Sequence, residues 1–252
     1  MSAIAVTGSS GRLGRMLVPM LTLAGHDVRT MSRRDGAGDH TVDLRTGRGL
    51  DEALRGVETV VHLATSNGSA DTTMTRTLTA ATERSQTSHL VLLSIVGVDR
   101  IPLAYYRHKL AAEQIVLNSR TPATVLRATQ FHELLDAFFH AQRRLPLRLA
   151  PALPVQPIAA RDVAQRITAL VAQLPAGRQP DLGGPQQITW SEASALWGAA
   201  HRPRQRSITI RVPGATARAI RDGHGLVPGP AHGELSYTDH VRAAAEQADG
   251  ER

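Results

Sequence analysis

The chain has 252 residues, 42% of them hydrophobic and 20% charged, which is the composition of a soluble globular protein with a full core. It contains no cysteine, which excludes a disulfide scaffold, a thiolate metal site and a cysteine nucleophile. No run approaches the roughly 18 apolar residues of a membrane span, and no basic segment followed by an apolar one opens the chain. We therefore expect a cytoplasmic protein without a membrane partner.

The charge is strongly basic, with a formal net charge of +7 and a pI near 11.0, which raises nucleic acid as a candidate partner. However, Lys109 is the one lysine among 29 basic residues, so the arginine content resembles a genome-wide composition bias more than a selected basic patch. Aromatic residues, at 3%, offer few platforms for base stacking. We expect no nucleic-acid partner. The surviving lysine marks a position where a planar, bulkier guanidinium would not serve.

Short apolar runs alternate with segments of helical spacing along the first half of the chain. Strands are predicted at residues 3–7, 28–31, 41–42, 59–64, 89–95 and 123–127. Helices are predicted at residues 13–24, about 50–55, 71–86 and 103–118. This alternation is typical of parallel crossover units, so the predicted fold class is α/β, a doubly wound parallel sheet of the Rossmann type.

The composition of the sequence changes from about residue 143, where prolines become frequent and apolar runs become short. A helix is predicted at 161–174 and a turn at 181–185, and residues 242–252 have the composition of a frayed tail. We expect a dinucleotide-binding core over residues 1–142 and a smaller substrate-binding region over residues 143–252, interleaved with the core.

A glycine-rich segment joins the first predicted strand to the first predicted helix. Gly8, Gly11 and Gly14 have the spacing that permits a tight turn, a close approach to a pyrophosphate and close packing of helix on strand. The start of the helix offers free amides to the phosphates. The residues expected to bind the dinucleotide here are Thr7, Gly8, Ser10, Gly11, Arg12, Leu13 and Gly14.

The end of the second predicted strand bears on the choice of cofactor. An acidic residue there would bind the ribose diol of NAD, whereas this chain has Ser32, Arg33 and Arg34. Two arginines and a hydroxyl suit a 2′-phosphate, so NADP(H) is the preferred cofactor and NAD(H) a possible one. The alternative is that both arginines face water.

Tyr105 and Lys109 lie four residues apart on a predicted helix and so share one face. A tyrosine beside a lysine and a bound nicotinamide has a lowered phenol pKa, which lets it exchange the proton that accompanies hydride transfer. Lysine can also hydrogen-bond the nicotinamide ribose. Tyr106 is within reach of Lys109 as well.

With these motifs the chain resembles an atypical short-chain dehydrogenase/reductase of the NmrA-like NAD(P)H-binding group. The matching segments are TGSSGRLG at 7–14, SRR at 32–34, VDL at 42–44, VVHLAT at 60–65, LLSIVGVDRIPLAYYRHKLAAE at 92–113, VLRATQFHELL at 125–135 and DLGGP at 181–185. The resemblance implies that Asp43 and Leu44 hold the adenine, that Leu63, Ala64 and Thr65 line the nucleotide cleft, and that residues 128–131 approach the nicotinamide.

The chain departs from this family where the substrate carbonyl would be bound. Active members place a serine or threonine at the position of Val96, and Ser94 lies two residues earlier. The expected catalytic residues are Tyr105, Lys109 and Ser94, with Phe131 and His132 expected to bind substrate. His62, within an apolar strand, is expected to be a hydrogen-bonded core histidine.

The predicted activity is NADPH-dependent reduction of a small carbonyl, enone, imine or quinone substrate, by a monomer or homodimer. One alternative is a regulatory protein that senses NADP(H) without turnover, which the missing serine favours. A sugar-nucleotide epimerase or dehydratase is another, for which the C-terminal region is short. No metal site is expected, because the histidines show no ligand spacing.

Overall fold

The computed structural model describes residues 2–229 and 232–250, and the chain divides into two compact units. The first unit comprises Met1–Asp99, Leu103–Arg127 and Val163–Pro180. The second comprises Arg100–Pro102, Ala128–Asp162 and Asp181–Arg252. The expected boundary at residue 142 falls inside the second unit, and the chain returns to the first unit before it ends in the second.

The first unit contains a seven-stranded sheet in the order β3-β2-β1-β4-β5-β6-β9. Its strands are β1 (Ala3–Thr7), β2 (Asp27–Ser32), β3 (His40–Thr41), β4 (Thr59–His62), β5 (His89–Ile95), β6 (Ala123–Ala128) and β9 (Gly177–Arg178). The pairs β2–β3, β1–β2, β1–β4, β4–β5 and β6–β9 are parallel. This topology confirms the predicted Rossmann sheet.

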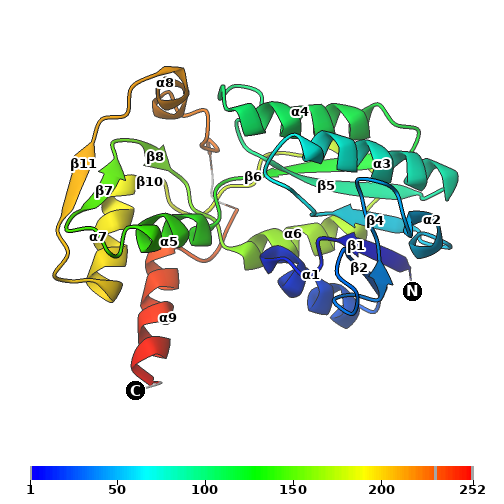
Figure 1. Cartoon of the computed structure of the whole chain (residues 1–252), viewed down its shortest axis with the longest axis horizontal. Helices are drawn as coiled ribbons and strands as arrows, with labels where there is room; N and C mark the ends of the chain where they lie inside the picture. The colour runs from blue at the N-terminus through cyan, green and yellow to red at the C-terminus, as the bar shows by residue number, and fades with distance from the viewer. Residues whose placement is uncertain (1, 230–231, 251–252) are drawn as a thin grey trace. The chain divides into compact units, whose positions relative to one another are not determined.

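Helices cover both faces of this sheet (Figure 1), as the crossover connections require. They are α1 (Arg12–Leu23), α2 (Leu50–Ala53), α3 (Ala70–Arg84), α4 (Ala104–Leu117) and α6 (Ala160–Val171), of which α6 begins in the second unit. The pair α3 and α4 lies on one face, and α1 and α6 lie on the other. The strand interiors are buried aliphatic residues such as Val60, Leu90 and Leu92, which pack against Leu78 of α3.

The strand order creates a crevice at the carboxyl ends of the central strands. β1 lies between β2 and β4, so the connection that follows β1 leads to one side of it and the connection from β3 to β4 leads to the other. Thr7, the last residue of β1, stands level with Met31 and His62. In open parallel sheets ligands bind where the connections diverge, beyond the carboxyl ends of such strands.

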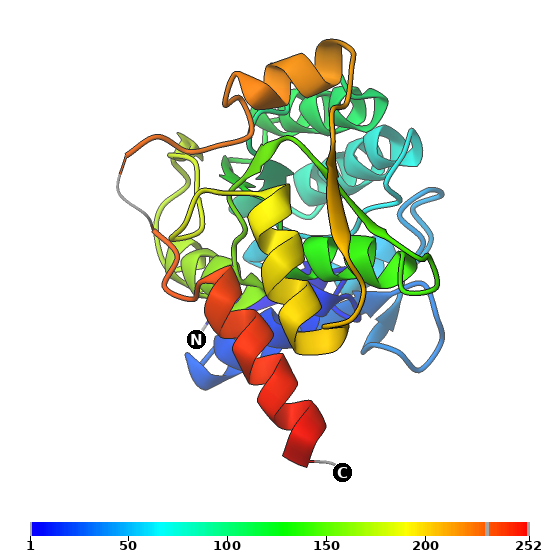
Figure 2. The same cartoon turned by 90° about the vertical axis from the view of Figure 1, so that its left-hand side faces the viewer.

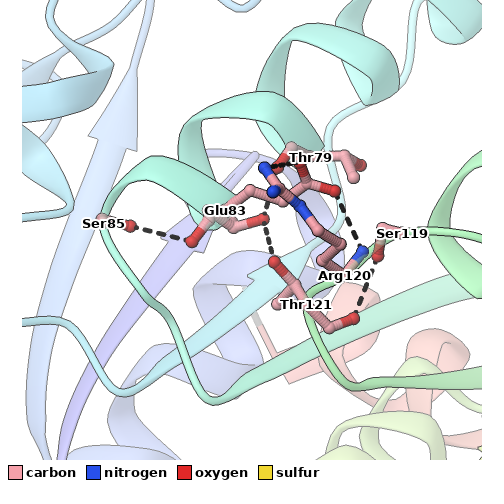
Figure 3. A network of polar contacts seen from close by, with 7 residues as sticks. Thr79, Glu83, Ser85, Ser119, Arg120 and Thr121 are labelled. Atoms are coloured by element: carbon pink, nitrogen blue, oxygen red, sulfur yellow. Dashed lines mark hydrogen bonds and ion pairs between the residues drawn. The ribbon is translucent and has the colours of Figure 1, made fainter.

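The turn between α4 and β6 is fastened to α3 (Figure 3). The Glu83 carboxylate accepts hydrogen bonds from the Arg120 amide at 3.0 Å and from its guanidinium at 3.1 Å, which lowers the pKa of Glu83. The Thr82 and Thr121 hydroxyls are 3.0 Å apart, and Ser119 donates to the Thr121 carbonyl. These contacts fix the entry of β6 beside β5.

The second unit is built from short strands and four helices among the described residues. They are α5 (His132–Ala141), β7 (Arg148–Pro151), β8 (Pro154–Val155), β10 (Ile188–Thr189), α7 (Trp190–His201), β11 (Ser207–Ile210), α8 (Ala215–Arg221) and α9 (Tyr237–Gly250). β7 pairs with β11 in parallel, and β8 pairs with β10 in the antiparallel sense. A capping box between Thr189 and Glu192 starts α7.

Helix α9 corrects the expectation of a frayed tail. It packs against α7, as Figure 2 shows, and residues 242–250 are helical; residues 251–252 lie outside the described residues. Tyr237 and Val241, one turn apart, are buried in a core with Leu135, Phe139 and Trp197. The apolar residues that anchor this helix precede the segment that was expected to fray.

The helices described here include none with the length and apolar character needed to cross a bilayer.

Candidate functional site

A cavity of about 740 Å³ lies in the crevice beyond the carboxyl ends of β1, β2 and β4, wholly within the first unit. Its wall comes from the turn after each of these strands and from α1 and α3. The lining residues are Thr7, Gly8, Ser10, Gly11, Arg15, Met31, Ser32, Arg33, Arg34, Val42, Leu44, Leu63, Ala64, Thr65, Ser66 and Met74.

The turn between β1 and α1 has room only for glycine at two positions. Gly8 has a φ of +70°, and a Cβ there would lie 2.8 Å from the Ala64 nitrogen. A Cβ on Gly14 would lie 2.5 Å from the carbonyl oxygens of Gly8 and Ser9. Gly11 precedes α1 without a side chain to cap it, so the first helical amides are left to an anion. The turn therefore has the shape and polarity of a phosphate-binding loop.

The end of β2 gives the cavity a positive charge. Arg33 and Arg34 are exposed and line it, as does Arg15, whose guanidinium donates to the Ser10 carbonyl. No carboxylate is among the lining residues. Asp39, on the loop after β2, accepts from the amide and hydroxyl of Thr30, which lowers its pKa. The residues present thus fit an anionic group at this end of the cavity.

The expected cofactor-binding residues divide into two groups. The structure places Thr7, Gly8, Ser10, Gly11, Ser32, Arg33, Arg34, Leu44, Leu63, Ala64 and Thr65 on the cavity wall. The residues that lie outside this wall are Arg12, Leu13, Gly14, Asp43 and Lys109.

Three of the five residues outside the cavity wall have structural roles instead. Leu13 is buried under α1. The Asp43 carboxylate accepts from the Arg45 amide at 2.9 Å, and its pKa is lowered mainly by that bond, so it orders the turn after β3. Gly14 contributes by its lack of a side chain.

Sequence reasoning missed several wall residues. They are Arg15, Met31, Val42, Ser66 and Met74. A usable signal existed for Arg15, which stands four residues after Gly11 and so one helical turn above the glycine loop. The two methionines and the valine belong to apolar patterns that also predict ordinary core positions.

A buried carboxylate organises the loop after β4. Asp71, 3% exposed at the start of α3, accepts from the Thr65 hydroxyl at 2.6 Å and from the amide and hydroxyl of Ser66. The Tyr105 hydroxyl is 3.3 Å from the Thr65 hydroxyl oxygen. Since Thr65 gives its proton to Asp71, the tyrosine is the donor in this contact. Tyr105, Thr65 and Asp71 thus form a chain of hydrogen bonds that begins at the cavity wall.

Burial raises the pKa of Tyr105, and the Asp71 carboxylate raises it further, whereas the bond to Thr65 acts in the opposite direction. This is opposite to the lowering expected for a tyrosine beside a lysine and a bound nicotinamide. Lys109 is buried and donates to the Leu93 carbonyl of β5 at 3.0 Å. Burial lowers the pKa of Lys109, while Asp71 and Glu113 favour its charged form.

The carboxyl end of β5 differs from that of an active short-chain dehydrogenase. The Ser94 hydroxyl is buried and makes no hydrogen bond to any described residue, and Val96 is fully buried. His62 is hydrogen-bonded in the core: its ring nitrogens lie 2.8 Å from the Thr7 hydroxyl and 3.2 Å from the Thr75 hydroxyl. Burial lowers the pKa of His62 to about 3, so the prediction of a core histidine is confirmed.

A buried ion pair fixes the helix that carries Tyr105 and Lys109. The Glu113 carboxylate, one turn after Lys109 on α4, accepts two hydrogen bonds from the Arg127 guanidinium of β6, at 2.9 and 2.7 Å. Both side chains are nearly inaccessible. Asp99 makes a second ion pair with Arg127 at 3.0 Å. No sequence pattern pointed to this pair.

The expected substrate residues Phe131 and His132 lie in the second unit, at the start of α5. His132 is 1% exposed, and its ring lies 4.9 Å from that of His240 and 5.6 Å from that of Tyr237. Burial lowers the pKa of His132 to about 4. This ring is therefore neutral and enclosed. Across the described part of the chain, no group of three or more acidic or histidine side chains is placed to hold a metal ion.

A family model described as NAD(P)H-binding matches residues 8–173, which include the glycine loop, the cavity wall and Lys109. The chain belongs to this NAD(P)H-binding family. Its motifs and fold are those of an atypical short-chain dehydrogenase/reductase, as the resemblance implied. It is therefore a member of an oxidoreductase-like family.

Individual relatives agree with this membership. The chain is 28% identical to a ceramide reductase of Caulobacter vibrioides over 98% of its own length and 88% of that protein. Two solved structures share its fold: a short-chain dehydrogenase/reductase superfamily protein from Agrobacterium tumefaciens with bound NAD, and an NADPH-dependent quinone oxidoreductase from Escherichia coli with NADPH. The first has a TM-score of 0.73 at 21% identity, covering 99% of this chain and 98% of that one. The second has a TM-score of 0.77 at 16% identity, covering 96% and 99%.

Proposed function

We propose that this family member is an NADP(H)-dependent reductase that transfers a hydride to a carbonyl, enone, imine or quinone substrate. The observation that carries the proposal is the cavity at the switch point of the sheet, which joins a glycine loop to two exposed arginines and has no carboxylate on its wall. The name of the ceramide reductase, a relative that matches nearly the whole chain, supports a reductive direction.

Gly8, Gly11 and the start of α1 would hold the pyrophosphate, because amides and a positive helix end face it there. Arg33 and Arg34 would hold the 2′-phosphate of NADPH through charge-assisted bonds. Leu44, Leu63 and Ala64 would enclose the adenosine part, although Asp43 is engaged in its own turn. When bound, the reduced nicotinamide supplies the hydride.

Tyr105 would supply the proton. The phenol is protonated at neutral pH, as a proton donor to a reduced substrate oxygen must be, and its raised pKa makes it a weaker acid than the tyrosine that the resemblance implies. The Thr65 hydroxyl, held by Asp71, would position the Tyr105 hydroxyl, and Lys109 would stabilise the phenolate until it regains a proton from solvent. In this scheme Thr65 orients the proton donor at a site where the usual serine is replaced by Val96.

A second candidate is a protein that binds NADP(H) and signals its redox state without turnover. The observation in its favour is Ser94, whose hydroxyl is buried and makes no hydrogen bond among the described residues. A substrate carbonyl would therefore have one donor fewer than in an active short-chain dehydrogenase.

The test is a titration with NADPH, NADH, NADP and NAD, repeated on Arg33→Ala/Arg34→Ala. We expect tight NADPH binding and a loss of about 10- to 100-fold in the double variant, since charge-assisted bonds contribute about 1.5–3 kcal/mol each and are only partly formed at an exposed site. Arg55→Ala, an exposed arginine after α2 that does not line the cavity, is the control for the loss of a surface arginine. Equal binding of NADPH and NADH would overturn the cofactor assignment, and no binding would overturn the proposal.

Turnover is tested with a panel of ketones, enones, imines and quinones under NADPH. We expect Tyr105→Phe to remove activity and Asp71→Asn to shift the alkaline limb of the rate profile to lower pH, because Asp71 raises the pKa of Tyr105 and the phenol must be protonated to donate. Tight NADPH binding with no oxidation by any substrate would favour the sensor instead.

A further inference from the structure

Two turns of the second unit form a basic concavity far along the chain from the glycine loop. It encloses about 410 Å³ between the turn that follows α5 and the turn that follows α7. Its lining residues are Arg143, Leu145, Pro146, His201, Arg202, Pro203, Arg204 and Gln205. We call this, together with Arg144, Leu147, Arg206 and the outward side of β11, the basic surface.

No carboxylate is among the residues of the basic surface, although Asp136 of α5 interacts electrostatically with His201 on its wall. The chain has no Asp or Glu between Asp136 and Asp162, nor between Glu192 and Asp222, and β7 and β11, which pair with each other, lie in these two stretches. None of its five arginines belongs to an ion pair of the described residues. An anionic partner is the chemistry that complements it.

Aliphatic side chains on the same two turns and on β11 are exposed beside these arginines. Leu145 is 48% exposed and Leu147 39%, and both lie on the turn that enters β7. On β11, Ser207 and Thr209 bond to serines of α7, so the alternating residues Ile208 and Ile210 point away from that helix. These isoleucines are 43% and 37% exposed. The basic surface is thus both cationic and apolar.

Glutamine side chains hold the two turns together, so the surface is preformed. The Gln205 amide donates to the carbonyls of Leu145 at 2.7 Å and Gln142 at 3.0 Å. Gln142 in turn accepts from the Leu149 amide at 2.8 Å. Arg148, buried beneath, donates to Ser194 and to Gln205 without a carboxylate partner. These bonds fix the exposed arginines and leucines on one rigid rim.

We propose that the basic surface docks this protein onto a membrane that carries anionic lipids. Arginines would bind the phosphate headgroups, and the leucines and isoleucines would enter the boundary between headgroups and acyl chains. A nucleic acid would use the arginines but gain little from aliphatic side chains, and the one ring on the wall, that of His201, is stacked on Trp197 at 4.7 Å. The surface therefore departs from the expectation of no membrane partner, although no span is needed.

The experiment is co-sedimentation of the full-length protein with vesicles of phosphatidylcholine, with and without phosphatidylglycerol, over a range of salt. We expect binding to the anionic vesicles that weakens as salt rises. Arg202→Gln/Arg204→Gln should weaken it by roughly 30-fold, since each basic residue near an anionic surface contributes about a fivefold effect. Leu145→Ser/Ile208→Ser should remove the part of the binding that survives at high salt. Arg55→Gln/Arg107→Gln, exposed arginines of the first unit, is the charge-matched control.

Several results would overturn the proposal. They are equal binding to both kinds of vesicle, an equal loss in the charge-matched control, or tight binding of duplex DNA that the Arg202→Gln/Arg204→Gln change removes while vesicles do not bind. NADPH affinity is measured on the same variants and should not change. A failure here is therefore distinguishable from a failure of the proposed dinucleotide site.

Discussion

The ion pair between Glu113 and Arg127 should dominate the stability of the first unit. Its two charges are 2% and 4% exposed, so removing either one leaves the other buried without its closest partner. Breaking such a pair costs about 3–5 kcal/mol. Arg127 retains Asp99 as a partner, which is 44% exposed, whereas Glu113 would retain no ion pair. We expect the free energy of unfolding to fall by about 3 kcal/mol in Glu113→Leu and by about 5 kcal/mol in Arg127→Met.

The double variant distinguishes pairing from simple damage to the core. If the two effects were independent, Glu113→Leu/Arg127→Met would lose about 8 kcal/mol, the sum of the two losses. Because two apolar side chains remove both buried charges, we expect it to lie within about 2 kcal/mol of the unchanged protein. Urea unfolding at pH 7 measures each free energy without adding salt. Additive losses in the double variant would refute the reasoning.

Further predictions concern the glycine loop, the buried histidine and the second unit. Gly14→Ala should weaken NADPH binding by about 10- to 100-fold while the fold persists, because its Cβ displaces the loop; an unchanged titration would contradict this. Since the pKa of His62 is about 3, below its ordinary value, the unfolded chain takes up the proton first as the pH falls below about 6.5. The free energy of unfolding of the first unit should then fall by about 2 kcal/mol between pH 7 and pH 5. Urea unfolding at the two pH values measures this difference, which His62→Gln should abolish. Gly198→Ala would bring a Cβ within 2.0 Å of the buried Arg148 guanidinium and should cost about 1–3 kcal/mol in thermal unfolding; Gly68→Ala, with open space around it, is the control and should cost little.

The parts of the fold that could be predicted are those with a local signal. β5 spans the predicted residues 89–95, because its apolar run is long and ends at a turn. β9 has only two residues, too few for any periodicity, and its place depends on β6, some fifty residues earlier in the chain. The doubly wound parallel sheet followed from the alternation of strands and helices, whereas its last strand did not.

The residues of the candidate site likewise divide into those with a local sequence signal and those without one. Gly8, Gly11, Arg33 and Arg34 are found from sequence because one contiguous turn or strand end carries each signal. Asp71 is different, because its importance arises only when the loop after β4 folds back onto the start of α3 and brings Thr65 to it.

The position of β9 governs how the nascent chain completes its sheet. A chain that has emerged only as far as residue 176 can form six of the seven strands, but β6 then has an unpaired edge of amides and carbonyls. Gly177 and Arg178 can cover part of that edge only after the second-unit segment that separates them from β6, Ala128–Asp162, has been synthesised. Truncations just before residue 177 should therefore aggregate through this edge, and the ribosome-bound chain would need protection until then.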